Sequence, residues 1–190
     1  MEQKRRTTAR PLRALRKARR SGHLVRISRD WPDADRIDGF VLAVSRTWTL
    51  VALLGPTVML DGFAAVRTGD VVRVRRRAGR EDFPVSVLAV RGQWPPRPPF
   101  DVVLASASTI IAGAADLFPL VRIHTETVDL PASVIGRSVR CTRRKVRLRE
   151  ITRRGRWRRR TTTLPMAAVT RIEFGRRVDQ ALIEYAGLPD

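Results

Sequence analysis

The tetrapeptide Leu-Val-Arg-Ile at Leu24–Ile27 returns at Leu120–Ile123, and this repeat decides how the rest of the chain is interpreted. Further features follow each copy in the same order. A glycine, Gly39 in the first copy and Gly136 in the second, precedes an alternating apolar strand. Features that recur at a fixed period are the signature of a duplicated structural unit. The sequence therefore predicts two copies of one unit.

Each copy reads as a helix, about five short antiparallel strands and a second, shorter helix. The closing hairpin repeats at a constant spacing, with Val66, Val71, Arg73 and Val74 matching Leu164, Val169, Arg171 and Ile172. Helices are expected at 9–20 and 103–118 before the strands, and at 85–91 and 178–186 after them, where a glycine marks each stop. Strands that alternate on this plan fit a small closed barrel filled by side chains.

The prolines between the copies mark the expected domain boundary. Four of them fall within residues 95–99, where they would stiffen a connecting segment. We predict a first unit at 1–95, a proline-rich linker at 96–100 and a second unit at 101–190.

The strands that begin at the glycines resemble the Sm-like family of small β-barrels. Residues 39–44 (GFVLAV) match the family's glycine and apolar alternation, and residues 66–71 (VRTGDV) approach its apolar-Arg-Gly motif with the glycine one place late. Ser45 and Thr49 stand where the family carries its base-contacting Asp and Asn, and residues 164–167 (LPMA) lack the glycine. The chain also resembles uncharacterised bacterial proteins built from tandem Sm-like units.

This resemblance implies a mainly β (α+β) fold of two tandem Sm-like or SH3-like small barrels, each preceded by a helix and followed by a short helix. It also implies RNA, rather than DNA, as the nucleic acid that the protein would bind. It implies no established activity.

The formal net charge of +20 is concentrated in two blocks. Residues 1–20 hold nine Lys or Arg side chains and one acid, and residues 137–160 hold thirteen and one. The remaining residues are close to balance. Basic clusters of this density are typical of proteins that bind nucleic acids or other polyanions.

The second block predicts a cationic hairpin. Arg147 and Arg149 alternate with Val146 and Leu148, which places both arginines on one outward face, and residues 153–156 read as the following turn. Guanidinium groups there would contact phosphates, and the indole of Trp157 would stack on an exposed base. The predicted binding residues are Arg140, Arg143, Arg144, Arg147, Arg149, Arg154, Arg156, Trp157, Arg158 and Arg159. The alternative is an ordinary solvated arginine surface with Trp157 packed inward.

The first block predicts an amphipathic basic helix. Leu12, Leu15 and Ala18 fall at helical spacing, and Pro11 suits a helix start. Its cations complete the set of predicted binding residues: Arg13, Arg16, Lys17 and Arg20. Membrane-surface binding is the competing use, but residues 1–23 contain no large aromatic anchor.

The sequence carries no pattern that indicates an enzyme, a metal site or a cofactor. His124 and Glu126 could supply two metal ligands on one strand face, but a third ligand is not evident, and His23 lies far away in the sequence. The single cysteine, Cys141, excludes an intrachain disulfide and suits a reducing compartment. We therefore predict no catalytic residues and no bound metal.

Localisation is predicted from the basic start and from the apolar stretches. Arginines interrupt residues 1–23, which argues against a secretory signal but leaves an organellar transit peptide open. The uncharged stretch at 102–115 is too short to span a bilayer and reads as a core helix. A cytoplasmic location is expected.

We expect a non-enzymatic protein that binds nucleic acid, with RNA favoured by the resemblance. The alternative from another class is a scaffold that docks an acidic protein or a ribonucleoprotein, and metal-dependent hydrolysis is a third interpretation. RNA versus DNA and the oligomeric state stay open at this point.

Overall fold

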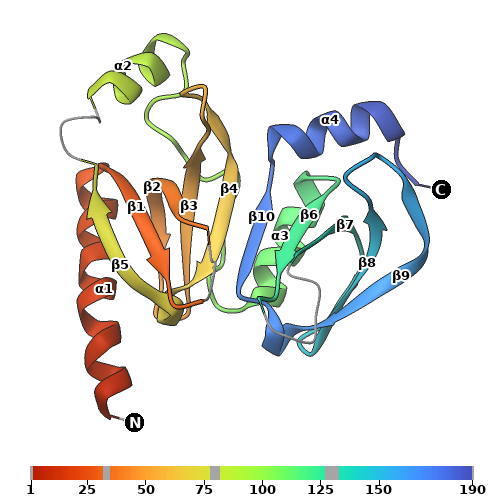
Figure 1. Cartoon of the computed structure of the whole chain (residues 1–190), viewed down its shortest axis with the longest axis horizontal. Coiled ribbons are helices and arrows are strands. Elements are labelled where there is room, and N and C mark those ends of the chain that lie inside the picture. The colour runs from red at the N-terminus through yellow and green to blue at the C-terminus, as the bar shows by residue number, and fades with distance from the viewer. Residues whose placement is uncertain (1, 32–34, 78–81, 127–132, 190) are drawn as a thin grey trace. The chain divides into compact units, whose positions relative to one another are not determined.

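A computed structural model describes residues 2–31, 35–77, 82–126 and 133–189, although not the side chains of residues 2–8 and 82. The chain divides into two compact units, Met1–Leu104 and Ala105–Asp190 (Figure 1). The stretch predicted as a linker, 96–100, belongs to the end of the first unit. Each unit is described by itself below.

The first unit is a five-stranded antiparallel sheet with a helix before it and a helix after it. Its strands lie in the order β5-β1-β2-β3-β4. In chain order the elements are α1 (Glu2–Ser21), β1 (Leu24–Arg29), β2 (Ile37–Val44), β3 (Trp48–Leu54), β4 (Leu60–Arg67), the 3-10 turn η1 (Thr68–Asp70), β5 (Val71–Arg76) and α2 (Asp82–Val90).

The second unit repeats this plan. Its strands lie in the order β10-β6-β7-β8-β9, so the last strand again pairs with the first. In chain order the elements are α3 (Ala107–Leu117), β6 (Val121–His124), β7 (Ser133–Cys141), β8 (Lys145–Ile151), β9 (Trp157–Pro165), the 3-10 turn η2 (Met166–Ala168), β10 (Arg171–Phe174) and α4 (Arg177–Ala186).

Irregularities in the sheets recur at matching places. The pairing shifts between Val41 and Ala43 in β2, and between Ser138 and Arg140 in β7. Val41 and Ser138 are as far apart in the chain as Gly39 and Gly136, and so are Ala43 and Arg140. A β-bulge redirects a strand and is kept as a feature of a fold. The shared strand order and the shared bulges support the interpretation of the chain as a duplication.

The prediction of two closed barrels is wrong, because the sheets are open. Among the described residues, no hydrogen-bonded ladder joins β4 to β5 or β9 to β10. A barrel closes only when strand tilt and stagger bring the first and last strands into register, and alternation along single strands carries no information about either. The β-rich character and the flanking helices were predicted, whereas the closure was not a property of the sequence pattern.

The first helix of each unit differs from its predicted bounds. α1 begins at Glu2, so Pro11 lies inside the helix instead of at its start. α3 is shorter than 103–118 because Ser106 ends the preceding extended segment: its hydroxyl accepts a hydrogen bond from the Thr109 amide, and the Thr109 side chain bonds back to the Ser106 amide. Such a capping box defines a helix N-terminus. None of the described helices is both long and apolar enough to cross a membrane.

Each helix covers part of its own sheet. α1 packs on β2 and β5, with Leu15 and Ala18 buried against Val25, Ile27 and neighbouring apolar residues. α3 packs on β6, β7 and β10 through Ile110, Ile111 and Ala114, which are all fully buried. The repeated apolar positions therefore form the core of each unit, as the alternation predicted.

A glycine in the second strand of each unit lets the neighbouring strand approach closely. A Cβ atom at Gly39 would collide with the backbone carbonyl of Ala52 on β3, and one at Gly136 would collide with the carbonyl of Arg149 on β8. The facing atoms are backbone, which cannot rotate away. Close approach of two main chains requires glycine at both positions.

We expect Gly136→Ala to lower the free energy of unfolding by roughly 1–3 kcal/mol or more, the usual cost of overpacking a well-packed site. The measurement is urea denaturation followed by circular dichroism. Gly69→Ala is the matched control, because a Cβ at Gly69 meets nothing within 4 Å. A stability unchanged in Gly136→Ala would contradict the close approach.

Candidate nucleic-acid interface

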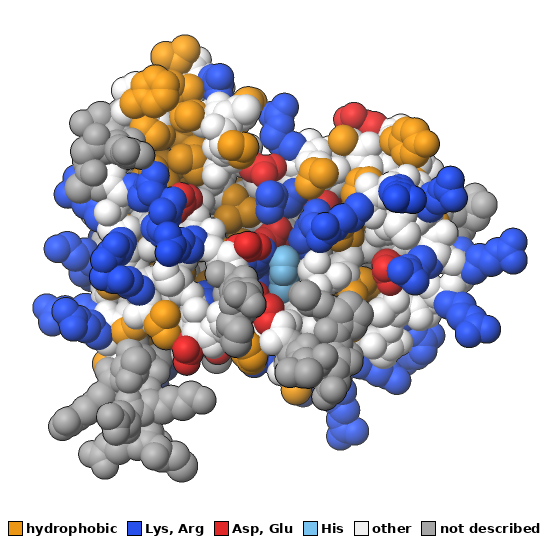
Figure 2. All heavy atoms as spheres, in the orientation of Figure 1, with side chains coloured by type: hydrophobic (Ala, Val, Ile, Leu, Met, Phe, Trp, Pro, Cys, Tyr) orange, Lys and Arg blue, Asp and Glu red, His pale blue; other side chains and the backbone are white. Residues whose placement is uncertain are grey.

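The outward face of β7, β8 and β9, with the two turns that join these strands, is the Arg-rich face. Across the strands, Arg140 lies opposite Arg147, and Arg137 lies opposite Arg149. Figure 2 shows Lys and Arg side chains standing out over this part of the second unit. The structure therefore places the arginines of successive strands opposite one another.

The predicted alternation along β8 is confirmed. Val146 and Leu148 are fully buried, while Arg147 is exposed and Arg149 is half-buried. The predicted turn is also confirmed, since the amide of Gly155 donates to the carbonyl of Thr152 at 3.0 Å. The other predicted arginines of this hairpin are all exposed: Arg140, Arg143, Arg144, Arg154, Arg156, Arg158 and Arg159.

The matching face of the first unit has a different chemistry. Strand pairing is the same between β2 and β3 as between β7 and β8, and it equates three arginines of the Arg-rich face, Arg137, Arg147 and Arg149, with Phe40, Leu50 and Ala52, which are buried. Phe40 is packed against Leu88 of α2 and meets the Trp94 ring with centroids 5.2 Å apart. At positions where the first unit carries apolar side chains, the second unit carries cations.

Few acids neutralise the Arg-rich face. Glu150 receives Arg158 Nε at 2.8 Å through Oε1 and the Thr162 hydroxyl at 2.8 Å through Oε2. In the described part of the chain, Glu150 is the one acid that pairs with an arginine of the hairpin. Like charges that face each other across strands repel, so the face carries an electrostatic cost that a bound anion would relieve.

A groove of about 400 Å³ lies on this face. Two arginines from adjacent strands, Arg137 and Arg149, line it, and its walls are completed by Ser138, Val139, Thr161 and Pro189. Arg149 is held in place because its Nη1 donates to the Arg159 carbonyl at 2.7 Å. Two guanidinium groups and two hydroxyls without a carboxylate in the lining form a concave surface suited to a phosphate group.

Trp157 is partly buried. Its indole packs beside the buried residues Leu120, Ile135 and Ile151, together with Leu182 of α4. Its Nε1 donates to the Gly187 carbonyl at 3.1 Å. These contacts favour the inward-packed alternative, and through them Trp157 joins α4 and the chain after it to the sheet.

Sequence reasoning missed Tyr185, the only tyrosine of the chain. It lies on α4 and is 80% exposed. Its ring lies over Gly155, in the turn that carries Arg153, Arg154 and Arg156. No pattern near residue 185 could have predicted this neighbourhood, because it depends on how α4 packs on the sheet.

The four predicted binding residues of the N-terminal block lie on the exposed side of α1. Arg13, Arg16, Lys17 and Arg20 are exposed, while Leu15 is fully buried. The predicted amphipathic helix is thereby confirmed, with its apolar side packed on the first sheet. It forms a second basic surface, on the first unit.

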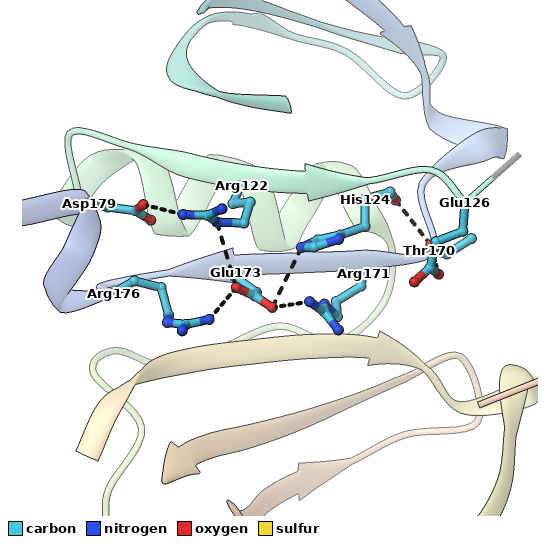
Figure 3. Close-up of polar contacts among 8 residues, drawn as sticks. All are labelled: Arg122, His124, Glu126, Thr170, Arg171, Glu173, Arg176 and Asp179. Carbon is cyan, nitrogen blue, oxygen red and sulfur yellow. Dashed lines mark hydrogen bonds and ion pairs between the residues drawn. The ribbon is translucent and has the colours of Figure 1, made fainter. Parts of the chain in front are cut away.

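A buried group of charged residues, here called the Glu173 cluster, was also missed by sequence reasoning. Figure 3 shows arginine and histidine side chains of the second unit directed at the Glu173 carboxylate. Glu173 Oε1 pairs with Arg171 at 2.6 Å, and Oε2 pairs with Arg176 at 2.6 Å. The nearest nitrogens of His124 and Arg122 lie 3.5 and 3.8 Å from the same carboxylate. Arg122 also pairs with Asp179 at 2.7 Å.

Burial and ion pairing shift the pKa values of the acids and the histidine in the Glu173 cluster. Burial alone would raise the pKa of Glu173, but His124, Arg171 and Arg176 outweigh it and hold that pKa well below its usual range. Burial lowers the pKa of His124, although the nearby Glu173 carboxylate acts to raise it. Burial raises the pKa of Asp179, although Arg122 acts to lower it. Because the cluster links β6 and β10 to the first turns of α4, it fixes the helix that carries Tyr185.

The repeated arginine of the tetrapeptide has a different partner in each unit. Arg26 makes two bonds to Asp38, at 2.7 and 2.6 Å, and thereby lowers the pKa of that carboxyl. In the second unit Ile135 takes the place of Asp38, and Arg122 turns to Asp179 instead. The same arginine of the repeat therefore makes a different ion pair in each unit.

The two side chains proposed as partial metal ligands, His124 and Glu126, lie in the second unit and each contacts a different side chain. Glu126 Oε2 accepts from the Thr170 hydroxyl at 2.6 Å, while His124 faces Glu173. No group of three or more His, Cys, Asp or Glu suited to a metal ion occurs in the described ranges. Cys141 is half-buried, and burial raises its pKa.

Comparison with known proteins finds no family model, no curated protein and no solved structure that matches this chain. The resemblance to the Sm-like family therefore stays a prediction.

Proposed function

We propose that the protein binds nucleic acid through the Arg-rich face of its second unit, with RNA as the favoured partner. The observation that carries this proposal is the exchange between the units: Arg137, Arg147 and Arg149 stand where the first unit carries buried apolar residues. The choice of RNA follows from the resemblance to the Sm-like family.

The chemistry of the face supports a phosphate backbone as the ligand. Guanidinium groups bind phosphate oxygens through paired hydrogen bonds, and the lining of the groove supplies two such groups. Contacts to phosphates carry no sequence information. We therefore propose binding without strong sequence preference, by a non-enzymatic protein with no required cofactor.

The proposal extends to the basic side of α1 and to a cytoplasmic location. The exposed cations of α1 provide a second set of phosphate contacts on the first unit. A chain with one cysteine needs no oxidising compartment, which supports the proposed location.

The test is the salt dependence of binding to a short single-stranded RNA, measured by fluorescence anisotropy with nuclease-treated protein. Each neutralised phosphate releases counterions, so the logarithm of the affinity should fall by about 0.7 per contact for each tenfold rise in salt. An affinity that does not change with salt would refute the proposal. An acidic polypeptide that stays bound after nuclease treatment, with no RNA binding by the freed protein, would favour a scaffold that docks an acidic partner.

A further inference from the structure

Tyr185 is an exposed aromatic ring set into a cationic surface. Its side chain is 80% exposed, and a Cβ atom placed on Gly155 would lie 2.5 Å from its Cδ1. The ring therefore rests on the glycine backbone of the turn between β8 and β9. Figure 2 shows hydrophobic side-chain atoms over α4 next to Lys and Arg side chains.

The turn beneath the ring is built to leave this space. Gly155 has φ of +69°, a left-handed conformation that favours glycine, and it has no side chain to displace the ring. Arg154 and Arg156 flank it and are exposed. One side of the ring thus contacts the protein, while most of its surface is open to a ligand.

The position of the ring is fixed from two sides. The Glu173 cluster ties the start of α4 to the sheet, and the Trp157 indole bonds to the Gly187 carbonyl just beyond its end. Pro189 then borders the groove that holds Arg137 and Arg149. The segment from Tyr185 to Pro189 therefore runs from the aromatic ring to the groove lined by Arg137 and Arg149.

From this arrangement we infer that Tyr185 stacks on a nucleobase and that the partner of the Arg-rich face is a single-stranded nucleic acid. The inference rests on the proposed function and narrows it. A base inside a duplex is already stacked on both faces, whereas an unpaired base offers its π-face to an aromatic ring. Arginines beside the ring would hold the phosphates on either side of the stacked base.

The experiment compares Tyr185→Leu and Tyr185→Phe with the unchanged protein on two probes of equal length and charge. One probe is a single-stranded uridine oligonucleotide, and the other is an abasic strand without bases. Loss of one stacking contact should weaken uridine binding by about 5- to 150-fold in Tyr185→Leu, whereas Tyr185→Phe keeps the ring and should bind nearly as the unchanged protein does. Neither substitution should alter binding of the abasic strand.

Val178→Ala, at the opposite end of α4 and also exposed, is the matched control and should leave both affinities unchanged. If the unchanged protein binds both probes equally, or if Tyr185→Leu binds uridine normally, the stacking inference is overturned and the proposed function stands. If neither probe binds, both are overturned. Preferential binding of a duplex of the same length would also overturn the single-strand assignment.

Discussion

Replacing Arg140, Arg147, Arg154 and Arg156 with glutamine is expected to weaken binding of single-stranded RNA by two to three orders of magnitude at about 0.1 M salt. Each phosphate contact contributes about 0.7 to the steepness with which log affinity falls against log salt, so the loss of four contacts makes this slope less steep by about 3. Extrapolated from about 1 M to about 0.1 M salt, that change in slope corresponds to a loss on the order of 10³-fold. The measurement is the same anisotropy titration over a range of salt concentrations.

These four arginines are chosen because their removal is expected to leave the fold intact. All four are exposed, and none makes an ion pair with a described residue. Arg158 is left unchanged because it pairs with Glu150, and Arg149 because it donates to the Arg159 carbonyl. Removing exposed like charges should leave the free energy of unfolding unchanged or slightly higher.

The matched control removes the same charge elsewhere. Arg46, Arg73, Arg75 and Arg97 are exposed residues of the first unit, outside both basic blocks. Their replacement with glutamine lowers the net charge equally but should change the salt slope little. Equal losses in the two variants would show that net charge, and not the Arg-rich face, governs binding.

Glu173→Gln is expected to destabilise the second unit by about 3–5 kcal/mol, the usual cost of removing one partner from a buried ion pair. The carboxylate is 3% exposed and is the shared partner of Arg171 and Arg176, with Arg122 close by. Glutamine fills the same space but leaves these cations without their counter-charge. The measurement is urea denaturation, and Glu184→Gln on the exposed side of α4 is the control.

The pH dependence provides an independent check on Glu173. Its folded-state pKa lies below the reference value of 4.5, so its contribution to stability is present above pH 4.5 and is lost as the pH falls further. The unchanged protein should therefore lose stability more steeply in acid than Glu173→Gln does. If the two proteins respond to acid alike, the carboxylate is not the centre of the cluster.

Much of the candidate site could be predicted from local pattern. The alternation of Val146, Arg147, Leu148 and Arg149 decides which side chains point outward, because successive residues of a strand face opposite sides. The turn at Gly155 and the apolar side of α1 followed from the same kind of local pattern. Each of these predictions depends on residues that are close together in the chain.

The errors arose where the answer depends on distant parts of the chain. Trp157 was predicted to stack on a base because its neighbours in sequence are arginines, yet it is partly buried against a core cluster that Leu182 and Ile183 of α4 also contact. Tyr185 was not considered because no cation adjoins it in sequence, yet it lies over the arginine-bearing turn. Closure of the sheets was predicted from a resemblance and from alternation, neither of which specifies strand stagger.

The sequence by itself determined that the protein is built from a duplicated unit, that this unit is β-rich with flanking helices, and that its positive charge lies in two blocks. These properties follow from periodicity and composition, which a linear chain displays directly. The tertiary structure alone decided that the sheets are open, and that Glu173 gathers arginines from β6, from β10 and from the residue just before α4. It also decided that the exposed aromatic ring beside the Arg-rich face is Tyr185. Such features arise when segments far apart in the chain pack together, because contacts between them depend on the path of the backbone and not on the spacing of residues along it.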